Sequence, residues 1–199
     1  KKSRDYYYMD HGYFNHSNRN FKNSNTTVFD LDGYFRIVHN NYWHNGLGNN
    51  KSDRLDKLNL KFKKIKRNGD YIILSAPSAG SIKFFNLDNW VEETKLKIRK
   101  YTDREIIVHS KNSKIPLFEL LDKAWAFVSN HSTAGMKAMV NGIPAYFTDS
   151  QLSKIAHIEK IENHEINYNA LNNLAYGQWT LKEIASGEAW EFLSKQNKY

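Results

Sequence analysis

Short apolar stretches alternate with helical stretches between residues 71 and 147, and no other feature of the sequence constrains the fold as strongly. Strands are expected at residues 71–74, 105–108, 125–128 and 143–147. Helices are expected between them at residues 87–100, 116–122 and 132–141, with Gly142 just past the last one, where glycine favours a helix end. Such alternation is typical of parallel βαβ units. The sequence therefore predicts an α/β fold with a Rossmann-like parallel sheet that carries helices on both faces.

The chain on either side of this unit has a different character. Residues 1–56 are polar and aromatic, so we expect an irregular N-terminal region with short strands at 6–9 and 33–39 and a loop at 15–27. Residues 57–199 are expected to form the Rossmann-like domain. Its C-terminal part, residues 170–195, is predicted to make a pair of helices, with Thr180 as an N-cap and Glu183 as its capping-box partner.

The composition limits the chemistry that this chain can perform. There is no cysteine, which excludes disulfides, thiolate metal sites and cysteine nucleophiles and makes the cytoplasm the default location. No apolar run approaches the roughly 20 residues of a membrane span, and no signal peptide is recognisable. A metal site is not expected either, because no His-x-x-x-His pair occurs and Asp30-Leu31-Asp32 is interpreted as a turn.

The net charge of +8, from 29 basic and 21 acidic residues, favours an anionic partner such as phosphate or nucleic acid. The basic residues are densest between 57 and 67, where no acidic residue occurs. The candidates in this stretch for contact with an acceptor or another polyanion are Lys61, Lys63, Lys64 and Arg67. A solvated basic face is the alternative interpretation.

The stretch VSNHSTAG at residues 128–135 is the best candidate for a phosphate site. A predicted strand ends there in small polar residues and a helix begins at once, so free backbone N–H groups and the positive end of the helix dipole are expected to meet. Ser132 and Thr133 add hydroxyl groups, and Gly135 allows a ligand or a neighbouring strand to approach closely. An ordinary N-cap with a packing glycine is the alternative.

Two other predicted loops end at the same edge of the sheet. Residues 75–81 are interpreted as a loop of small residues, from which Ser78 and Gly80 could contact a phosphate. Lys111 follows the second predicted strand, where a flexible positive charge could offset a leaving diphosphate. An ordinary βα loop and a solvated lysine are the corresponding alternatives.

The pattern of residues 128–146, a strand followed by SNHSTAG, a helix and Gly-Ile-Pro before the next strand, resembles the donor-binding half of GT-B-type glycosyltransferases. The stretches YMDHGYF (8–14), YFRI (34–37) and LAYGQWT (174–180) resemble small phage-associated proteins of glycosyltransferase type. The resemblance implies that a nucleotide-sugar is the co-substrate, that no cofactor is needed, and that residues 57–199 bind this donor. It also implies that residues 1–56 lie on the acceptor side.

A transferase of this kind needs a base to deprotonate the acceptor hydroxyl. Asp10 and His11 are the first candidates, because a predicted strand delivers them into a turn that contains Gly12. Asp10 is interpreted as the base and His11 as the residue that orients it, although a turn cap and a packed ring are the alternatives. His39 and His44 are the next candidates.

The sequence thus predicts a glycosyltransferase that moves a sugar from a nucleotide-sugar to an acceptor hydroxyl. A hydroxymethylated base in phage DNA is the acceptor that the basic charge favours, and polysaccharide or lipid-linked sugars are others. Two further functions stay open on the same fold: a nucleic-acid-binding module without catalysis, and a phosphosugar epimerase.

Overall fold

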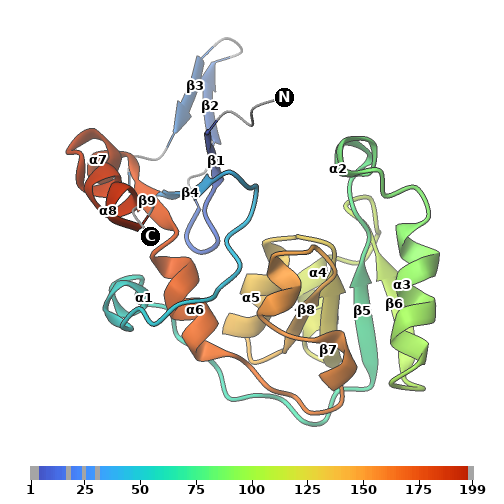
Figure 1. The fold of residues 1–199 in the computed structure, drawn as a ribbon. Helices are drawn as coiled ribbons and strands as arrows, with labels where there is room; N and C mark the ends of the chain where they lie inside the picture. Colours follow the sequence, from blue (N-terminus) through green and yellow to red (C-terminus); the bar gives the residue numbers. More distant parts are fainter. Residues whose placement is uncertain (1–4, 17–18, 24–25, 30–31, 197–199) are drawn as a thin grey trace.

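The computed structural model describes residues 5–16, 19–23, 26–29 and 32–196, and its central element is a four-stranded parallel sheet (Figure 1). The strand order is β6-β5-β7-β8. The bounds are Tyr71–Ser75 for β5, Glu105–His109 for β6, Ala124–Ser129 for β7 and Ala145–Phe147 for β8. All three neighbouring pairs are parallel, which confirms the predicted sheet.

The sheet is buried on both faces, which explains why its strands are continuous apolar runs. On one face, Ile73 and Phe127 pack with the apolar side of α5 (Ala134–Val140) and with α4 (Leu117–Leu121). On the other face, Ile72 and Leu74 pack with α3 (Trp90–Arg99) and with η2 (Ile158–Lys160). Helices on both faces were predicted, and this prediction is confirmed.

The loop predicted at residues 75–81 is only partly a loop. A short helix, α2 (Ala79–Phe85), begins where Ser78 accepts a hydrogen bond from the Ser81 amide. Asn86 then takes a left-handed conformation with φ of 54°, which ends α2 and separates it from α3. Gly80 therefore lies in a helical turn and not in an extended loop.

The sequence predicts an irregular N-terminal region, but the structure has regular strands there. Strands β1 (Tyr7–His11) and β4 (Tyr34–His39) form an antiparallel sheet with β9 (Gln178–Thr180), in the order β1-β4-β9. The predicted strands at 6–9 and 33–39 are thus confirmed. The loop predicted at 15–27 is wrong, because β2 (Arg19–Asn23) pairs there with β3 (Thr26–Phe29). The β-branched residues of β3 favour a strand, but no apolar alternation announces the hairpin.

The C-terminal part holds three helices and one strand where the sequence predicted two helices. They are α6 (Tyr168–Ala175), β9, α7 (Leu181–Ala185) and α8 (Glu188–Gln196). The predicted capping box of Thr180 and Glu183 is confirmed at the start of α7. Since β9 pairs with β4, the end of the chain completes the N-terminal sheet. Helix α1 (Asp53–Lys57) and η1 (Leu152–Lys154) are the remaining helical elements of the described residues.

The turn after β1 is fixed by contacts with the C-terminal strand. The buried Gln178 side chain accepts a hydrogen bond from the Phe14 amide at 2.9 Å, and the Gly12 amide donates to the Tyr34 carbonyl at 2.9 Å. A methyl group on Gly12 would come within 2.8 Å of that carbonyl oxygen, so the close approach requires glycine. These contacts hold Asp10 and His11, which immediately precede the turn, against the rest of the molecule.

Among the residues that the structure describes, no helix combines the length and the apolar character that a membrane crossing requires.

Candidate functional site

The strand order creates a point at which successive loops leave the sheet in opposite directions. Strand β5 pairs with β6 on one side and with β7 on the other. The chain therefore leaves β5 toward β6 and leaves β7 in the opposite direction, toward β8. Open α/β sheets bind their ligands at such a switch point. The position matches the sheet edge that the sequence predicted for the ligand.

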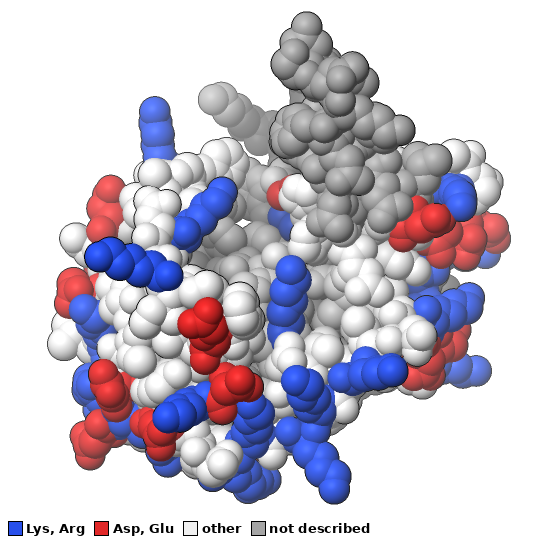
Figure 2. All heavy atoms as spheres, turned by 180° about the vertical axis from the view of Figure 1, so that it is seen from behind, with Lys and Arg blue, Asp and Glu red and all other residues white. Residues whose placement is uncertain are grey.

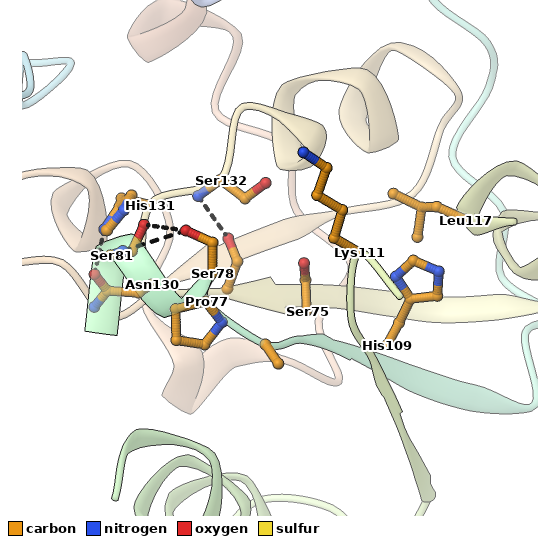
Figure 3. A pocket seen from close by; sticks show the side chains of 12 residues that line it. Ser75, Pro77, Ser78, Ser81, His109, Lys111, Leu117, Asn130, His131 and Ser132 are labelled. Carbon is orange, nitrogen blue, oxygen red and sulfur yellow. Dashed lines mark hydrogen bonds between the residues drawn. The ribbon is translucent and has the colours of Figure 1, made fainter. Parts of the chain in front are cut away.

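A pocket of about 310 Å³ lies at this point, and we call it the switch-point pocket (Figure 3). The loops after β5, β6 and β7 all contribute to its wall. The lining residues are Ser75, Ala76, Pro77, Ser78, Ser81, His109, Lys111, Leu117, Ser129, Asn130, His131 and Ser132. Three of the predicted donor-binding residues, Ser78, Lys111 and Ser132, are thus brought together.

Hydroxyl groups and one cation dominate the polar wall of this pocket. Figure 3 shows the Ser75 hydroxyl, at the end of β5, and the Lys111 side chain, from the loop after the neighbouring strand β6, on the same side of the sheet edge. Lys111 is exposed, and within the described part of the chain it forms no ion pair. An unpaired lysine beside several hydroxyl groups is suited to an anionic group such as a phosphate.

Several of the backbone N–H groups that the sequence predicted for the phosphate site already have partners in the protein. The amide of Ser132 donates to the Ser129 hydroxyl, that of Ala134 to the Ser132 hydroxyl, and those of Gly135 and Met136 to carbonyls one turn back. Because these four N–H groups already have partners, side chains have to supply much of the binding of an anionic ligand here. Thr133 is the N-cap of α5, and its hydroxyl caps no amide.

Gly135 faces the interior, which corrects its predicted role beside the donor. A methyl group on Gly135 would lie 2.7 Å from Cζ of Phe147 and 3.3 Å from Cβ of Ala145. The glycine therefore allows α5 to pack closely on β8, which is the second of the two reasons that the sequence offered for it. Gly80 is different, since its nearest neighbour would be the Ser78 hydroxyl at 3.9 Å.

A second pocket of about 560 Å³ adjoins the first, and we call it the aromatic pocket. It lies where the N-terminal sheet faces α2 and the loop after β7. Its lining residues are Tyr8, Asp10, His11, Arg36, Tyr42, Trp43, Ser78, Gly80, Ser81, Phe84, Phe85, His131, Ser132 and Thr133. The two pockets share Ser78, Ser81, His131 and Ser132. The fold thus brings the predicted acid–base pair next to the predicted donor-binding residues.

Asp10 is held by a buried arginine that sequence reasoning missed. Arg36 is 3% exposed and donates to Asp10 Oδ2 at 2.9 Å, to the His11 carbonyl at 2.7 Å and to the Tyr42 carbonyl at 3.0 Å. Burial raises the pKa of Asp10, but the His11 amide, Arg36 and the Tyr8 hydroxyl outweigh burial and lower the pKa overall. Asp10 therefore stays a carboxylate and is a weak base.

His131 belongs to the predicted phosphate motif, where the sequence assigns it no role, and it lines both pockets. Its Nδ1 contacts Oδ1 of Asn130, whose Nδ2 donates to the Thr148 hydroxyl at 2.9 Å. Since the Asn130 oxygen accepts, His131 Nδ1 is the donor, and Nε2 carries the lone pair of the neutral ring. Burial lowers the pKa of His131, so the neutral form prevails at pH 7.

The other predicted histidines do not line these two pockets. His39 lies 3.7 Å from Asp5 at the end of β4, and His44 Nδ1 accepts a hydrogen bond from the Gly46 amide. Asp30 and Leu31 lie outside the described residues, and Asp32 accepts a hydrogen bond from Lys182 at 2.6 Å. In the described ranges, no three His, Asp or Glu side chains gather as a metal site would require.

The basic residues Lys61, Lys63, Lys64 and Arg67 lie far from both pockets, on the segment that joins α1 to β5 (Figure 1). The Lys63 amide donates to the Val140 carbonyl and the Lys66 amide to the Gly142 carbonyl, so this segment follows the amino edge of the sheet. Figure 2 shows Lys and Arg side chains along the lower part of the molecule, interspersed with Asp and Glu. None of the four lines the aromatic pocket, so they are not contacts for a group that binds inside it.

Comparison of this chain with protein-family models, curated proteins and solved structures finds no match. What the two pockets can bind and catalyse has to follow from their own residues.

Proposed function

We propose that this protein is a glycosyltransferase that moves a sugar from a nucleotide-sugar to an acceptor hydroxyl. The observation that carries the proposal is the junction of the two pockets through Ser78, Ser81, His131 and Ser132. A donor with its diphosphate in the switch-point pocket would present its sugar at this junction. An acceptor in the aromatic pocket would then reach the anomeric carbon from the other side.

The donor phosphates would be held by side chains. Lys111 supplies the positive charge, and the hydroxyl groups of Ser75, Ser78 and Ser132 can donate to phosphate oxygens. As the glycosidic bond breaks, negative charge grows on the leaving diphosphate, and a cation beside it lowers the barrier. The proposed reaction uses no resident cofactor. As the sequence predicted, we propose the cytoplasm as the site of action and DNA as one acceptor.

We assign the proton transfer to His131 and not to Asp10. The neutral ring of His131 has Nε2 free to accept a proton, and Asn130 fixes the ring through Nδ1. Enzymes that activate a hydroxyl group commonly use a base whose side chain is oriented by a hydrogen bond to a further residue. Asp10, whose pKa is lowered, instead anchors Arg36 and the turn that carries His11.

A thermal-shift screen of nucleotide-sugars tests the donor site. A ligand at 100 times its dissociation constant stabilises the folded state by about 2.7 kcal/mol, so a cognate donor produces a clear shift. We expect Lys111→Ala to lose this shift. Lys114→Ala is the matched control, since Lys114 is exposed in the same loop and lines neither pocket. Equal shifts for both variants and the parent would refute the placement of the diphosphate.

The base is tested by His131→Gln, Asp10→Asn and His11→Gln in a transfer assay. General-base catalysis contributes roughly 10²–10⁴-fold, so His131→Gln is expected to lower kcat by about that factor with little change in donor binding. Asp10→Asn should cost less. If Asp10→Asn or His11→Gln is the more damaging change in kcat, the base is on the N-terminal sheet, as the sequence predicted. An epimerase would instead change the donor sugar when no acceptor is present.

A further inference from the structure

The aromatic pocket is lined by a continuous series of rings from four different segments. The ring centre of Tyr8 in β1 lies 4.9 Å from that of Tyr42. The Tyr42 ring centre lies 5.5 Å and 5.6 Å from those of Phe84 and Phe85 in α2. Phe85 lies 4.6 Å from His131, which is stacked on Trp43 at 5.1 Å with an angle of 26° between the rings. The largest surfaces that this pocket offers to a ligand are therefore ring faces and ring edges.

A buried cation stiffens one side of this pocket. The Arg36 guanidinium lies 3.7 Å from the centre of the Trp43 ring, and its three hydrogen bonds fix it in place. Stacking of arginine on tryptophan holds the Trp43 ring in one orientation. The pocket thus has a rigid wall before any ligand binds, which lowers the entropic cost of binding.

Helix α2 forms the opposite wall and is poorly covered by protein. None of its residues is buried, and Phe84 is 62% exposed although it lies at the mouth of the pocket. A large apolar side chain beside a pocket loses exposed area when a flat apolar ligand covers it, and this burial favours binding. Phe84 is therefore a contact surface that the protein itself leaves uncovered.

Polar groups line this pocket beside the rings, among them the hydroxyl groups of Tyr8, Ser81 and Thr133. The Asp10 carboxylate accepts hydrogen bonds at the rim. The Trp43 Nε1 and His11 Nδ1 atoms are buried and make no hydrogen bond within the described part of the chain. A planar base needs ring faces to stack on and a few hydrogen bonds at its edge, and this wall offers both.

We propose that the aromatic pocket binds a single nucleobase, stacked against Phe84, Tyr42 and the neighbouring rings. This inference rests on the proposed function and names the chemical class that its second pocket accepts. Because the proposed function places the acceptor in this pocket, the base belongs to an acceptor nucleic acid, and the nucleoside of the donor is the other source that the test has to separate. An acceptor base has to be unpaired or turned out of a duplex, because a paired base cannot enter a pocket between two walls.

Calorimetric titration with nucleoside 5′-monophosphates and with ribose 5-phosphate tests the proposal without any sugar transfer. We expect at least one monophosphate to bind about tenfold or more tightly than ribose 5-phosphate. Phe84→Ala should remove about tenfold of that affinity and leave ribose 5-phosphate binding unchanged. Phe118→Ala is the matched control, because Phe118 is 70% exposed on α4 and lines neither pocket.

A competition experiment then separates the two sources. If a nucleoside diphosphate displaces a single-stranded hexanucleotide in the parent protein, the pocket takes the base of the donor, and the placement of the acceptor in this pocket is wrong. If both bind together and Phe84→Ala weakens only the hexanucleotide, the pocket takes an acceptor base. The proposal is overturned if ribose 5-phosphate binds as tightly as every monophosphate, or if Phe84→Ala behaves like Phe118→Ala. Either of these results leaves the Lys111 test of the donor site unaffected.

Discussion

Replacement of Arg36 by methionine tests how the N-terminal sheet is held against the site. Methionine is similar in length to the aliphatic stem of arginine, and it removes the guanidinium that lies on the Trp43 ring together with its three hydrogen bonds. The carbonyls of His11 and Tyr42 then lose their charged donor, and a buried group without a partner costs about 1–3 kcal/mol. The pair with Asp10 adds at most about 1 kcal/mol, because the Asp10 side chain is 39% exposed.

The sum over the two carbonyls and the ion pair is a loss of about 2–7 kcal/mol in the free energy of unfolding, a range that includes the roughly 3–5 kcal/mol for breaking a buried ion pair. Urea denaturation measures it as a lower midpoint with an unchanged slope. Asp10→Asn should cost less than about 1 kcal/mol, because its partner keeps two backbone acceptors. Lys95→Met, which removes the exposed pair with Glu92 on α3, is the control and should stay within about 0.5 kcal/mol. The reasoning is wrong if Arg36→Met costs no more than Asp10→Asn.

Three further outcomes follow from packing, burial and capping. Gly135→Ala places a methyl group 2.7 Å from Phe147 and should lower the free energy of unfolding, measured by urea denaturation, by about 1–3 kcal/mol. Gly80→Ala in the open helix α2 is the control and should be neutral or stabilising by up to about 1 kcal/mol. Similar values for both variants would contradict the packing role of Gly135. Burial lowers the pKa of His164 below 6.5, so the unfolded state binds more protons and the free energy of unfolding should fall as pH drops below 6.5. His164→Asn, which tolerates the local φ of 56°, should show a smaller fall between pH 7.5 and 5.5, and an unchanged pH dependence would refute this cause. Thr180→Ala removes the capping box and should cost about 1 kcal/mol, and a loss below about 0.3 kcal/mol would show that the box is not stabilising.

The parallel sheet could be predicted because local sequence decides it. Each strand is an apolar run buried on both faces, and β5 with Ile72, Ile73 and Leu74 is an example. Helix α2 gave no such signal, because it buries none of its residues and so shows no amphipathic pattern. Strand β9 has only three residues and pairs with β4, about 140 positions away in the sequence, so no local pattern announces it.

The candidate site could be predicted in part for the same reason. Ser78, Lys111 and Ser132 follow predicted strands of one parallel sheet, so their common edge was implied by the topology. Arg36 was missed because its burial depends on the pairing of β1 with β4, in which it stands directly opposite Asp10. Opposite charges in Arg36, within one predicted strand, and Asp10, just after the other, are the signal that could have found it.

Release of nucleoside diphosphate from a panel of nucleotide-sugars measures the central claim, that the switch-point pocket holds a donor diphosphate for transfer. The parent protein and the Lys114→Ala control are expected to release nucleoside diphosphate from at least one donor, faster when acceptor is added. Lys111→Ala should release it at least about tenfold more slowly, since the loss of one charged contact is worth about 1.5–3 kcal/mol. Release from no donor by the parent protein, or equal release by Lys111→Ala, would contradict the account.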